Sequence, residues 1–121
     1  MATKEELQKE ALNELVEYSE KIIKGTEIVI KELRGTRKND TDELFNLVIK
    51  GINWEIEVFN NCEPLINKDV QKIDKEKMAA AVTRLGKVIQ EKDDIKLAAC
   101  LDVDFMPFLK AMEFAALTIS Q

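Results

Sequence analysis

Apolar residues at helical spacing run through most of this chain and restrict what it can fold into. In residues 3–34 they recur three and four positions apart, which places them along one face of a helix. They are Leu7, Ala11, Leu12, Leu15, Val16, Tyr18, Ile22, Ile23, Val29, Ile30 and Leu33. Because only four glycines and two prolines occur among 121 residues, there is little material for the turns of a sheet. The pattern predicts a few long helices.

Polar residues and glycines mark the ends of the first helix. Thr3 followed by Glu6 has the spacing of a capping box, in which each side chain accepts from a backbone N–H of the other residue. Gly35 ends the apolar pattern. We therefore predict one helix over about residues 3–34, with a bend at Gly25.

The second helix is predicted to begin after Asp40, whose side chain is a good N-cap and is followed by Glu43 at the third helical position. Its apolar pattern continues to about Cys62. Proline disfavours a helical conformation at the residue before it, so we expect Pro64 to open a short irregular or helical segment reaching Lys72.

Two further helices follow. Asp74 is an N-cap candidate for the third helix, with Ile73 and Met78 placed to form a hydrophobic staple around it. Asp93 is the N-cap candidate for a fourth helix that runs to about Ile119. Amphipathic helices joined by short connections predict an all-α fold, an antiparallel four-helix bundle, in a single domain of residues 1–121.

Pro107 lies inside the fourth helical pattern. A proline there cannot donate to the carbonyl of Val103 and crowds that turn, which predicts a kink or a break. A second interpretation is that the freed carbonyls contribute to a site near Asp102 and Asp104. These two residues are two positions apart, so on a helix they point about 160° away from each other and form no tight dyad.

Glu55 is the most unusual residue of the sequence. It falls in the middle of the apolar arc of the second helix, with Ile52, Val58 and Phe59 one turn away. A buried carboxylate needs a partner or a raised pKa. If the first two helices form a hairpin about residue 38, Glu55 lies opposite Lys21 and Ile22, near a few hydroxyl groups. We therefore predict a pKa raised by desolvation and hydrogen bonds from Ser19, Thr26 or Tyr18.

A buried polar layer formed by Glu55 and these hydroxyl groups has two interpretations. Buried polar groups can fix the register of packed helices, which is their best-attested use. Alternatively the Glu55 carboxyl contacts a ligand, and a divalent cation held by Glu55 together with Asp104 is the candidate metal site that the sequence offers.

The composition excludes several kinds of chemistry. The chain has no histidine, which removes His-based acid–base and nucleophilic catalysis. Its two cysteines, Cys62 and Cys100, are too few for a zinc site and sit among apolar neighbours, so buried reduced thiols are expected. The glycines are too scattered for a phosphate-binding loop. We predict a protein that is not an enzyme and needs no cofactor.

Charge limits the partners. A net charge of −5 disfavours binding to nucleic acid or anionic membrane. The basic cluster of Arg34, Arg37 and Lys38 follows the end of the first helix, where the helix dipole favours cations. The chain contains no signal-like or membrane-spanning apolar stretch, so a cytoplasmic location is expected.

The predicted bundle has more apolar surface than four single stripes require. The fourth helix is apolar on nearly all sides and the arc of the second helix is broad. The surplus could be covered by the segment after Pro64, by a second copy of the chain or by a partner protein. The surface predicted for a partner or homodimer is Trp54, Val58, Val103, Met106 and Phe114.

Residues 94–109 resemble a pattern in small uncharacterised helical proteins of spore-forming bacteria. Leu97-Ala98 and Pro107-Phe108-Leu109 carry the resemblance, and Val103-Asp104 stands where those proteins have an aromatic–acidic pair. The resemblance implies a bacterial cytosolic bundle and brings no activity with it. In general character the chain is also similar to acidic helical export chaperones and flagellar co-chaperones, an analogy of fold alone. The sequence therefore predicts a protein that acts by protein–protein interaction, as an adaptor, chaperone-like module or small regulator; the alternative is a bundle that responds to a ligand or divalent cation.

Overall fold

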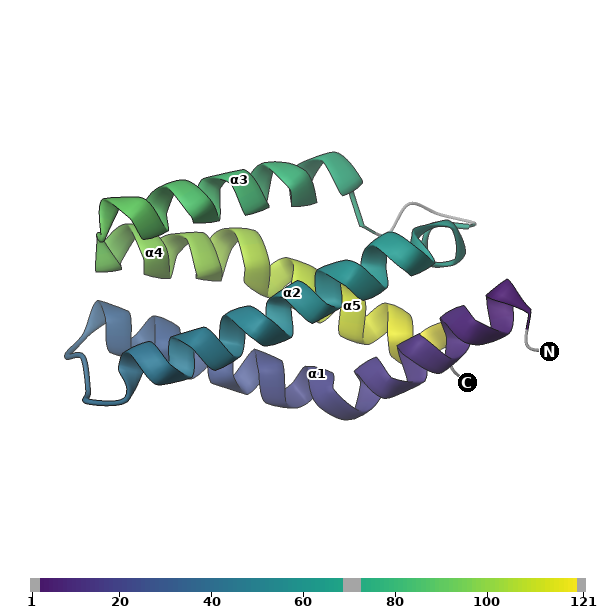
Figure 1. Cartoon of the computed structure of the whole chain (residues 1–121), viewed down its shortest axis with the longest axis horizontal. Coiled ribbons are helices and arrows are strands. Elements are labelled where there is room, and N and C mark those ends of the chain that lie inside the picture. The colour runs from purple at the N-terminus through teal and green to yellow at the C-terminus, as the bar shows by residue number, and fades with distance from the viewer. Residues whose placement is uncertain (1–2, 69–72, 120–121) are drawn as a thin grey trace.

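The computed structural model describes residues 3–68 and 73–119, which form an all-α bundle (Figure 1). The elements are α1 (Lys4–Arg34), α2 (Thr41–Ile66), α3 (Lys75–Glu91), α4 (Asp94–Cys100), the π-helical turn η1 (Leu101–Phe105) and α5 (Met106–Ile119). Because α4, η1 and α5 follow one another without a break, the described residues make four helices and no strand. The predicted fold class is confirmed.

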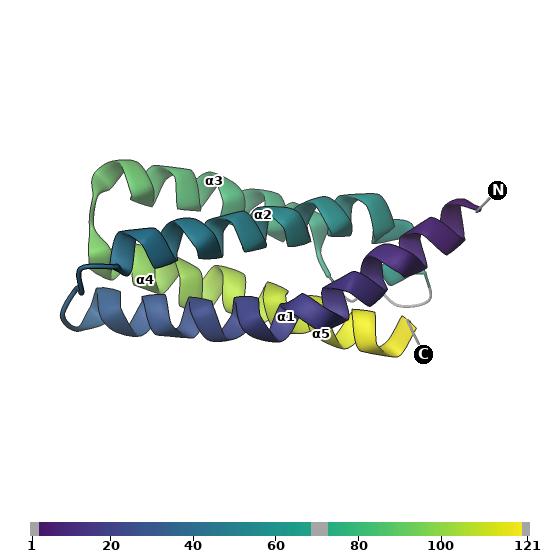
Figure 2. The same cartoon turned by 60° about the horizontal axis from the view of Figure 1, so that its bottom comes forward.

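The helices reverse direction at each connection, so that consecutive helices are antiparallel (Figures 1 and 2). α1 packs against α2, α4 and α5, and α2 also contacts α5. α3 is attached differently, because its main contacts are with α4 and η1. Within the described ranges, no helix has both the length and the apolar character needed to cross a membrane.

The core lies between α1, α2 and the last helix. Its largest fully buried apolar side chains are Leu12, Leu15, Val29, Ile52, Phe59, Ile66, Leu101, Phe105, Leu109 and Met112. The rings of Phe59 and Phe108 meet edge to face at 5.8 Å between centroids and join α2 to α5. Each fully buried side chain of this size contributes about 1.5–3 kcal/mol through the hydrophobic effect.

The start of α1 agrees with the prediction, because the Thr3 hydroxyl accepts from the backbone N–H of Glu6 at 3.1 Å. The helix continues through Gly25 without interruption. A Cβ at Gly25 would lie 3.2 Å from Cγ2 of Val48, which is closer than ordinary contact. This glycine therefore permits the close approach of α2.

The cap of α2 differs from the prediction. Asp40 occupies the N-cap position, but its side chain makes no capping hydrogen bond. The buried Thr41 hydroxyl instead accepts from the backbone N–H of Lys38 at 2.8 Å and donates to Glu32 Oε1 at 2.7 Å. The connection between α1 and α2 is therefore fixed by a threonine that faces inward.

The end of α2 was also predicted wrongly, because the helix runs past Cys62 and includes Pro64. Proline removes only one backbone bond there, and the helix closes soon afterwards where the Asn67 N–H donates to the Glu63 carbonyl at 2.9 Å. The Asn67 amide also bridges both backbone groups of Ile73, at 3.0 and 3.1 Å. Of the predicted 64–72 segment, residues 69–72 lie outside the described residues.

The starts of the other two helices are as predicted. Asp74 accepts from two backbone N–H groups in the first turn of α3, at 2.9 and 3.2 Å. Asp93 does the same for α4, at 3.0 and 3.1 Å. Ile73 and Met78, the predicted staple around Asp74, are both buried.

Pro107 neither breaks the last helix nor leaves it regular. The irregularity is η1, the π-helical turn that ends two residues before Pro107 and in which the N–H of Met106 reaches the carbonyl of Leu101 five residues back. The wider turn accommodates a residue that cannot donate to the carbonyl of Val103. It also brings Met106 towards the same side as Leu101, and both side chains are buried.

Candidate functional site

Glu55 is fully buried near the middle of α2, as predicted. Its exposure is 0 %, and neither of its carboxyl oxygens has a hydrogen-bond partner among the described residues. Burial, and to a lesser extent the negative charge of Glu113, raises the pKa of Glu55 to about 8. The group is therefore largely protonated at neutral pH, which avoids the free-energy cost of burying a charge.

The predicted hydrogen bonds to Glu55 are not formed. The Ser19 hydroxyl donates instead to Oε2 of Glu113 at 3.1 Å, across the α1–α5 contact. The Thr26 hydroxyl donates to the Ile22 carbonyl of its own helix at 2.7 Å. Both hydroxyls are buried, as expected, but Ser19 is bonded to a carboxylate of α5 and Thr26 to its own helix.

Tyr18, the third predicted partner of Glu55, points to the surface. Its ring meets Trp54 edge to face at 6.0 Å, and the ammonium of Lys21 lies 5.9 Å from its centroid. These residues line a shallow pocket of about 430 Å³ between α1 and α2, together with Glu14, Ile22, Lys50 and Gly51.

We call Glu55, Ser19 and Glu113 the Glu55 cluster. Glu113 is its one member that was not identified from the sequence. It lies on α5 between Met112 and Ala116, which are both buried. That spacing places a carboxylate at the edge of the apolar face, and this is the signal that could have identified it. Because the Glu55 oxygens are completely enclosed, a substrate could not touch this carboxyl group in the structure described.

Asp102 and Asp104 point to different partners, as predicted from their spacing. Asp102 pairs with Arg34 of α1 at 3.1 Å, and Asp104 makes two hydrogen bonds to Arg84 of α3, at 2.8 and 3.0 Å. Asp104 and Glu55 do not share a partner, and the described residues contain no cluster of three or more ligating side chains that could hold a metal ion.

The two arginines of the basic cluster are bound within the molecule. Arg37 makes hydrogen bonds of 2.6 and 2.7 Å to Asp94 of α4 and a further contact of 2.5 Å to Asp42 of α2. Its neighbour Arg34 is paired with Asp102. Both arginines thus tie the end of α1 to other elements, which agrees with a structural role for the cluster.

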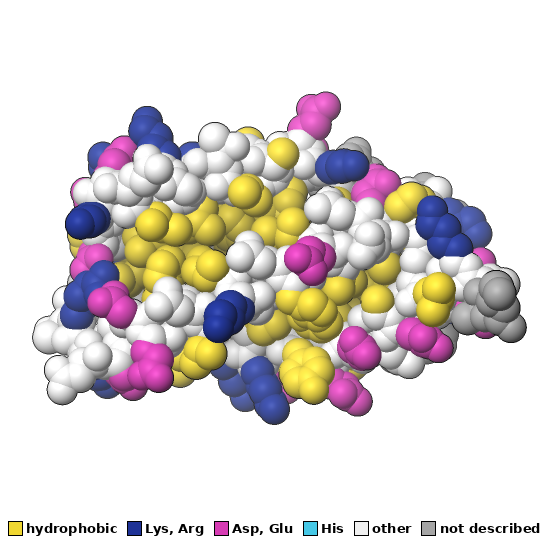
Figure 3. All heavy atoms as spheres, viewed as in Figure 1, with side chains coloured by type: hydrophobic (Ala, Val, Ile, Leu, Met, Phe, Trp, Pro, Cys, Tyr) yellow, Lys and Arg dark blue, Asp and Glu magenta, His cyan; other side chains and the backbone are white. Residues whose placement is uncertain are grey.

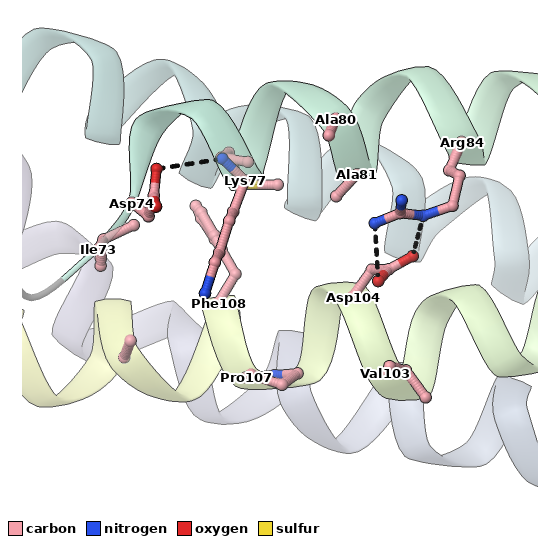
Figure 4. Close-up of a pocket in the computed structure, with 12 residues that line it drawn as sticks. Ile73, Asp74, Lys77, Ala80, Ala81, Arg84, Val103, Asp104, Pro107 and Phe108 are labelled. Atoms are coloured by element: carbon pink, nitrogen blue, oxygen red, sulfur yellow. Dashed lines mark hydrogen bonds and ion pairs between the residues drawn. The ribbon is translucent and has the colours of Figure 1, made fainter.

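A groove of about 740 Å³ lies between α3 and the η1–α5 segment (Figure 4). We call it the α3–α5 groove. It is lined by Ile73, Asp74, Lys77, Met78, Ala80, Ala81, Arg84, Val103, Asp104, Pro107, Phe108 and Ala111. It exists because α3 packs on α4 and η1 and diverges from α5 beyond them.

The α3–α5 groove has an apolar lining and a charged edge. The ion pair of Arg84 with Asp104 spans it at one end, and the start of α3 at Asp74 marks the other (Figure 4). Between them, the Lys77 side chain extends from α3 towards Phe108 (Figure 4). An apolar hollow with a few polar groups at its edge is the usual form of a binding site.

The predicted partner surface is only partly exposed. Val103 and Phe114 are 68 % and 65 % exposed, and Trp54 is half-buried. Val58 and Met106 are each only 5 % exposed, which corrects the prediction. Val58 belongs to the core stripe of α2, and the π-helical turn before Met106 rotates its side chain inward. Val103 lines the α3–α5 groove, whereas Trp54 lines the shallow α1–α2 pocket, so the five residues do not form one surface.

Comparison with known proteins identifies a family. No curated protein and no solved structure matches the chain. The model of the family described as "Domain of unknown function (DUF8042)" matches residues 10–114. This range covers α2, α3, α4 and η1 in full and most of α1 and α5, and it includes Glu55, Glu113 and both walls of the α3–α5 groove. The chain therefore belongs to the DUF8042 family.

Proposed function

We propose that this protein is a non-enzymatic, cytoplasmic binding module that acts by protein–protein contact, and that the α3–α5 groove is its docking site. The observation that carries the proposal is the attachment of α3. This helix packs on α4 and η1, and its first turns stand off from α5 over an apolar hollow of about 740 Å³.

The lining of the groove is suited to another protein. Met78, Ala81 and Phe108 are buried beneath it, and Val103 and Pro107 are exposed at its side. Contiguous exposed apolar surface of this kind marks interaction sites on soluble proteins. An amphipathic helix laid into a groove between helices is a recurring mode of recognition.

The other flank of α3 is also apolar. Val82 and Ile89 are more than one third exposed on this helix. Figure 3 shows apolar side chains gathered in the hollow between α3 and α2. α3 is thus the least covered helix of the bundle, which supports an interaction function centred on it.

The engagement of the candidate carboxyl groups supports a non-enzymatic role. Glu55 is enclosed, and Asp102 and Asp104 are held by arginines. Within the described residues, the acidic side chains of the groove are already engaged: Asp74 caps α3 and Asp104 pairs with Arg84.

Site-specific photo-crosslinking tests the proposal. A benzophenone side chain replaces Ala80, which lines the groove, and in a matched protein it replaces its exposed neighbour Ala79, which does not. We expect a discrete protein conjugate from position 80 and none from position 79. Equal conjugation from both positions would contradict docking in the groove.

A bundle that responds to a ligand or divalent cation is the alternative function. The unpartnered carboxyl group of Glu55 favours it, while the engagement of Asp104 by Arg84 weighs against a shared cation site. Titration with Mg²⁺, Mn²⁺ or Ca²⁺ distinguishes the two functions, because specific binding would raise the melting temperature with cation concentration. A flat response removes this alternative.

A further inference from the structure

We infer that the occupant of the α3–α5 groove is an amphipathic helix of another protein that carries an acidic side chain opposite Lys77. This inference rests on the proposed function and adds the chemistry of the partner. Three features of the groove lead to it: its length, the nature of its walls and the state of its charged groups.

The length of the groove fits a short helix. On α3, Asp74 and Arg84 lie nearly three helical turns apart, which is about 15 Å. On the opposite wall, Asp104 and Ala111 are separated by about 10 Å along the helix. Two to three turns of a partner helix therefore lie between the walls, presenting apolar side chains at positions i, i+3 or i+4, and i+7.

The walls favour a helix over an extended strand. Both walls are helices, whose backbone groups bond within each helix, so neither offers a free edge to a strand. An extended chain in this apolar trough would leave its own backbone groups unpaired, whereas a helix satisfies them internally. Ala80, Ala81 and Ala111 leave room for a helix to approach closely.

The charged groups of the groove indicate which charge the partner carries. The carboxylate of Asp74 accepts from the first turn of α3, and Arg84 and Asp104 neutralise each other. Among the described residues, the ammonium of Lys77 has no ion pair, and it extends across the groove mouth towards Phe108 (Figure 4). A carboxylate on the partner would pair with the Lys77 ammonium and fix the register of the partner helix, as complementary charges do at interfaces.

A second copy of the chain fits the groove less well. One exposed apolar stripe that a second copy could offer is on η1 and α5, where Val103, Phe114 and Leu117 are exposed. That stripe includes the exposed Lys110, which would bring a second cation to Lys77. Like charges in one interface disfavour the pairing. The Lys110 ammonium therefore disfavours this stripe of a second copy as the occupant, and a partner helix with an acidic flank fits Lys77 better.

Selection from a library of helical peptides tests the inference on the full chain. The probe is a displayed library of 14-residue peptides with apolar residues fixed at helical spacing and the flanking positions randomised. We expect the selected peptides to carry Asp or Glu on one flank. Their affinity for the Lys77→Glu protein should fall about tenfold or more, while the Lys87→Glu protein, changed on the same helix outside the groove lining, binds them like the original.

The outcomes separate this inference from the proposed function. Peptides that lose binding to Ala80→Trp but not to Ala79→Trp, and that show no acidic preference, overturn the inference and leave the groove as a docking site. A failure to select any peptide overturns the inference, while the proposed function is still decided by crosslinking at Ala80. Selected peptides that are insensitive to Ala80→Trp bind elsewhere and overturn both. Self-association in sedimentation that disappears in the Ala80→Trp protein assigns the groove to a second copy and overturns the inference. Lys77→Gln, which removes the charge without reversing it, serves as the milder variant, and thermal melting checks that each variant folds.

Discussion

The carboxyl group of Glu55 makes stability depend on pH. Its pKa in the folded protein is about 8, raised from an ordinary value of 4.5. Between these values the folded protein retains a proton that the unfolded chain has released, so stability falls as pH rises. The group's full contribution is present below about pH 4.5 and is lost by about pH 8, with a total change on the order of 5 kcal/mol.

Urea unfolding at intervals from pH 5 to pH 9 measures this dependence. We expect the free energy of unfolding to decrease over that range, and to change much less in Glu55→Gln, whose amide does not titrate. A stability that rises with pH from 5 to 8 would show that the Glu55 carboxyl is ionised and partnered in the folded protein.

Replacing Glu55 by leucine should stabilise the protein. The substitution removes two buried oxygens that have no hydrogen-bond partner and fills the space with apolar atoms. We expect a gain of roughly 1–3 kcal/mol in the free energy of unfolding at pH 8, measured by urea denaturation. Ser19→Ala is the contrasting change, because it removes a hydrogen bond to Glu113 and should destabilise. A loss of stability in Glu55→Leu would indicate a favourable contact of the carboxyl group.

At the same scale, the sequence predicts the burial of Glu55 but not its environment. Burial follows from the apolar residues one turn away on the same helix, which is local information. The partner of Ser19 depends on how α1 packs against α5, whereas the Thr26 hydroxyl bonds to a carbonyl of its own helix. Glu113 is 58 positions away from Glu55 in the chain, and only the packing of the helices brings its charge close enough to act on the Glu55 carboxyl. Local patterns carry no such information.

At the scale of the elements, we expect two glycines within helices to respond differently to alanine. A Cβ at Gly86 meets nothing within 4 Å, so Gly86→Ala should stabilise the protein by about 0.5–1 kcal/mol through helix propensity alone. At Gly51 a Cβ would lie 2.9 Å from Cγ1 of Ile22, where α1 and α2 pack closely. Gly51→Ala should therefore gain less or destabilise. Thermal and urea unfolding of the two variants compare them, and equal gains would contradict the close packing at Gly51.

Helix starts were predictable from the sequence, whereas the form of the last helix was not. Thr3, Asp74 and Asp93 act through N–H groups within three residues, so spacing alone identifies them. Pro107 predicts an irregularity, but a kink, a break and a π-helical turn all accommodate a missing donor. The π-helical turn is the form that buries Met106 together with Leu101, and that preference comes from the completed core.

At the scale of the whole molecule, Arg37 joins the α1–α2 connection to the start of α4. It pairs with Asp94 and Asp42, and these contacts raise the pKa of the guanidinium and lower that of the Asp94 carboxyl. The group is 42 % exposed, so solvent screens the attraction. We expect Arg37→Ala to lower the free energy of unfolding by less than about 1 kcal/mol, and the loss to shrink in 1 M salt. A loss that is unchanged by salt would point to packing instead.

The overall architecture was available from the sequence, but the groove was not. Four amphipathic stripes with short connections specify a bundle, and the structure has one. The α3–α5 groove results from the angle at which α3 leaves its contacts with η1, and no residue pattern encodes that angle directly. For the same reason the predicted partner surface combined residues from separate places, such as Trp54 and Val103.

The reactivity of the two free thiols reports local opening of the bundle. Cys62 on α2 and Cys100 on α4 are both buried, and burial raises the pKa of each, that of Cys100 to about 11. Alkylating reagents attack the thiolate, so the native protein should react slowly and only when a helix swings open. The modification rates of single-cysteine versions, compared by mass spectrometry, would then show whether the bundle opens more often around Cys62 or around Cys100.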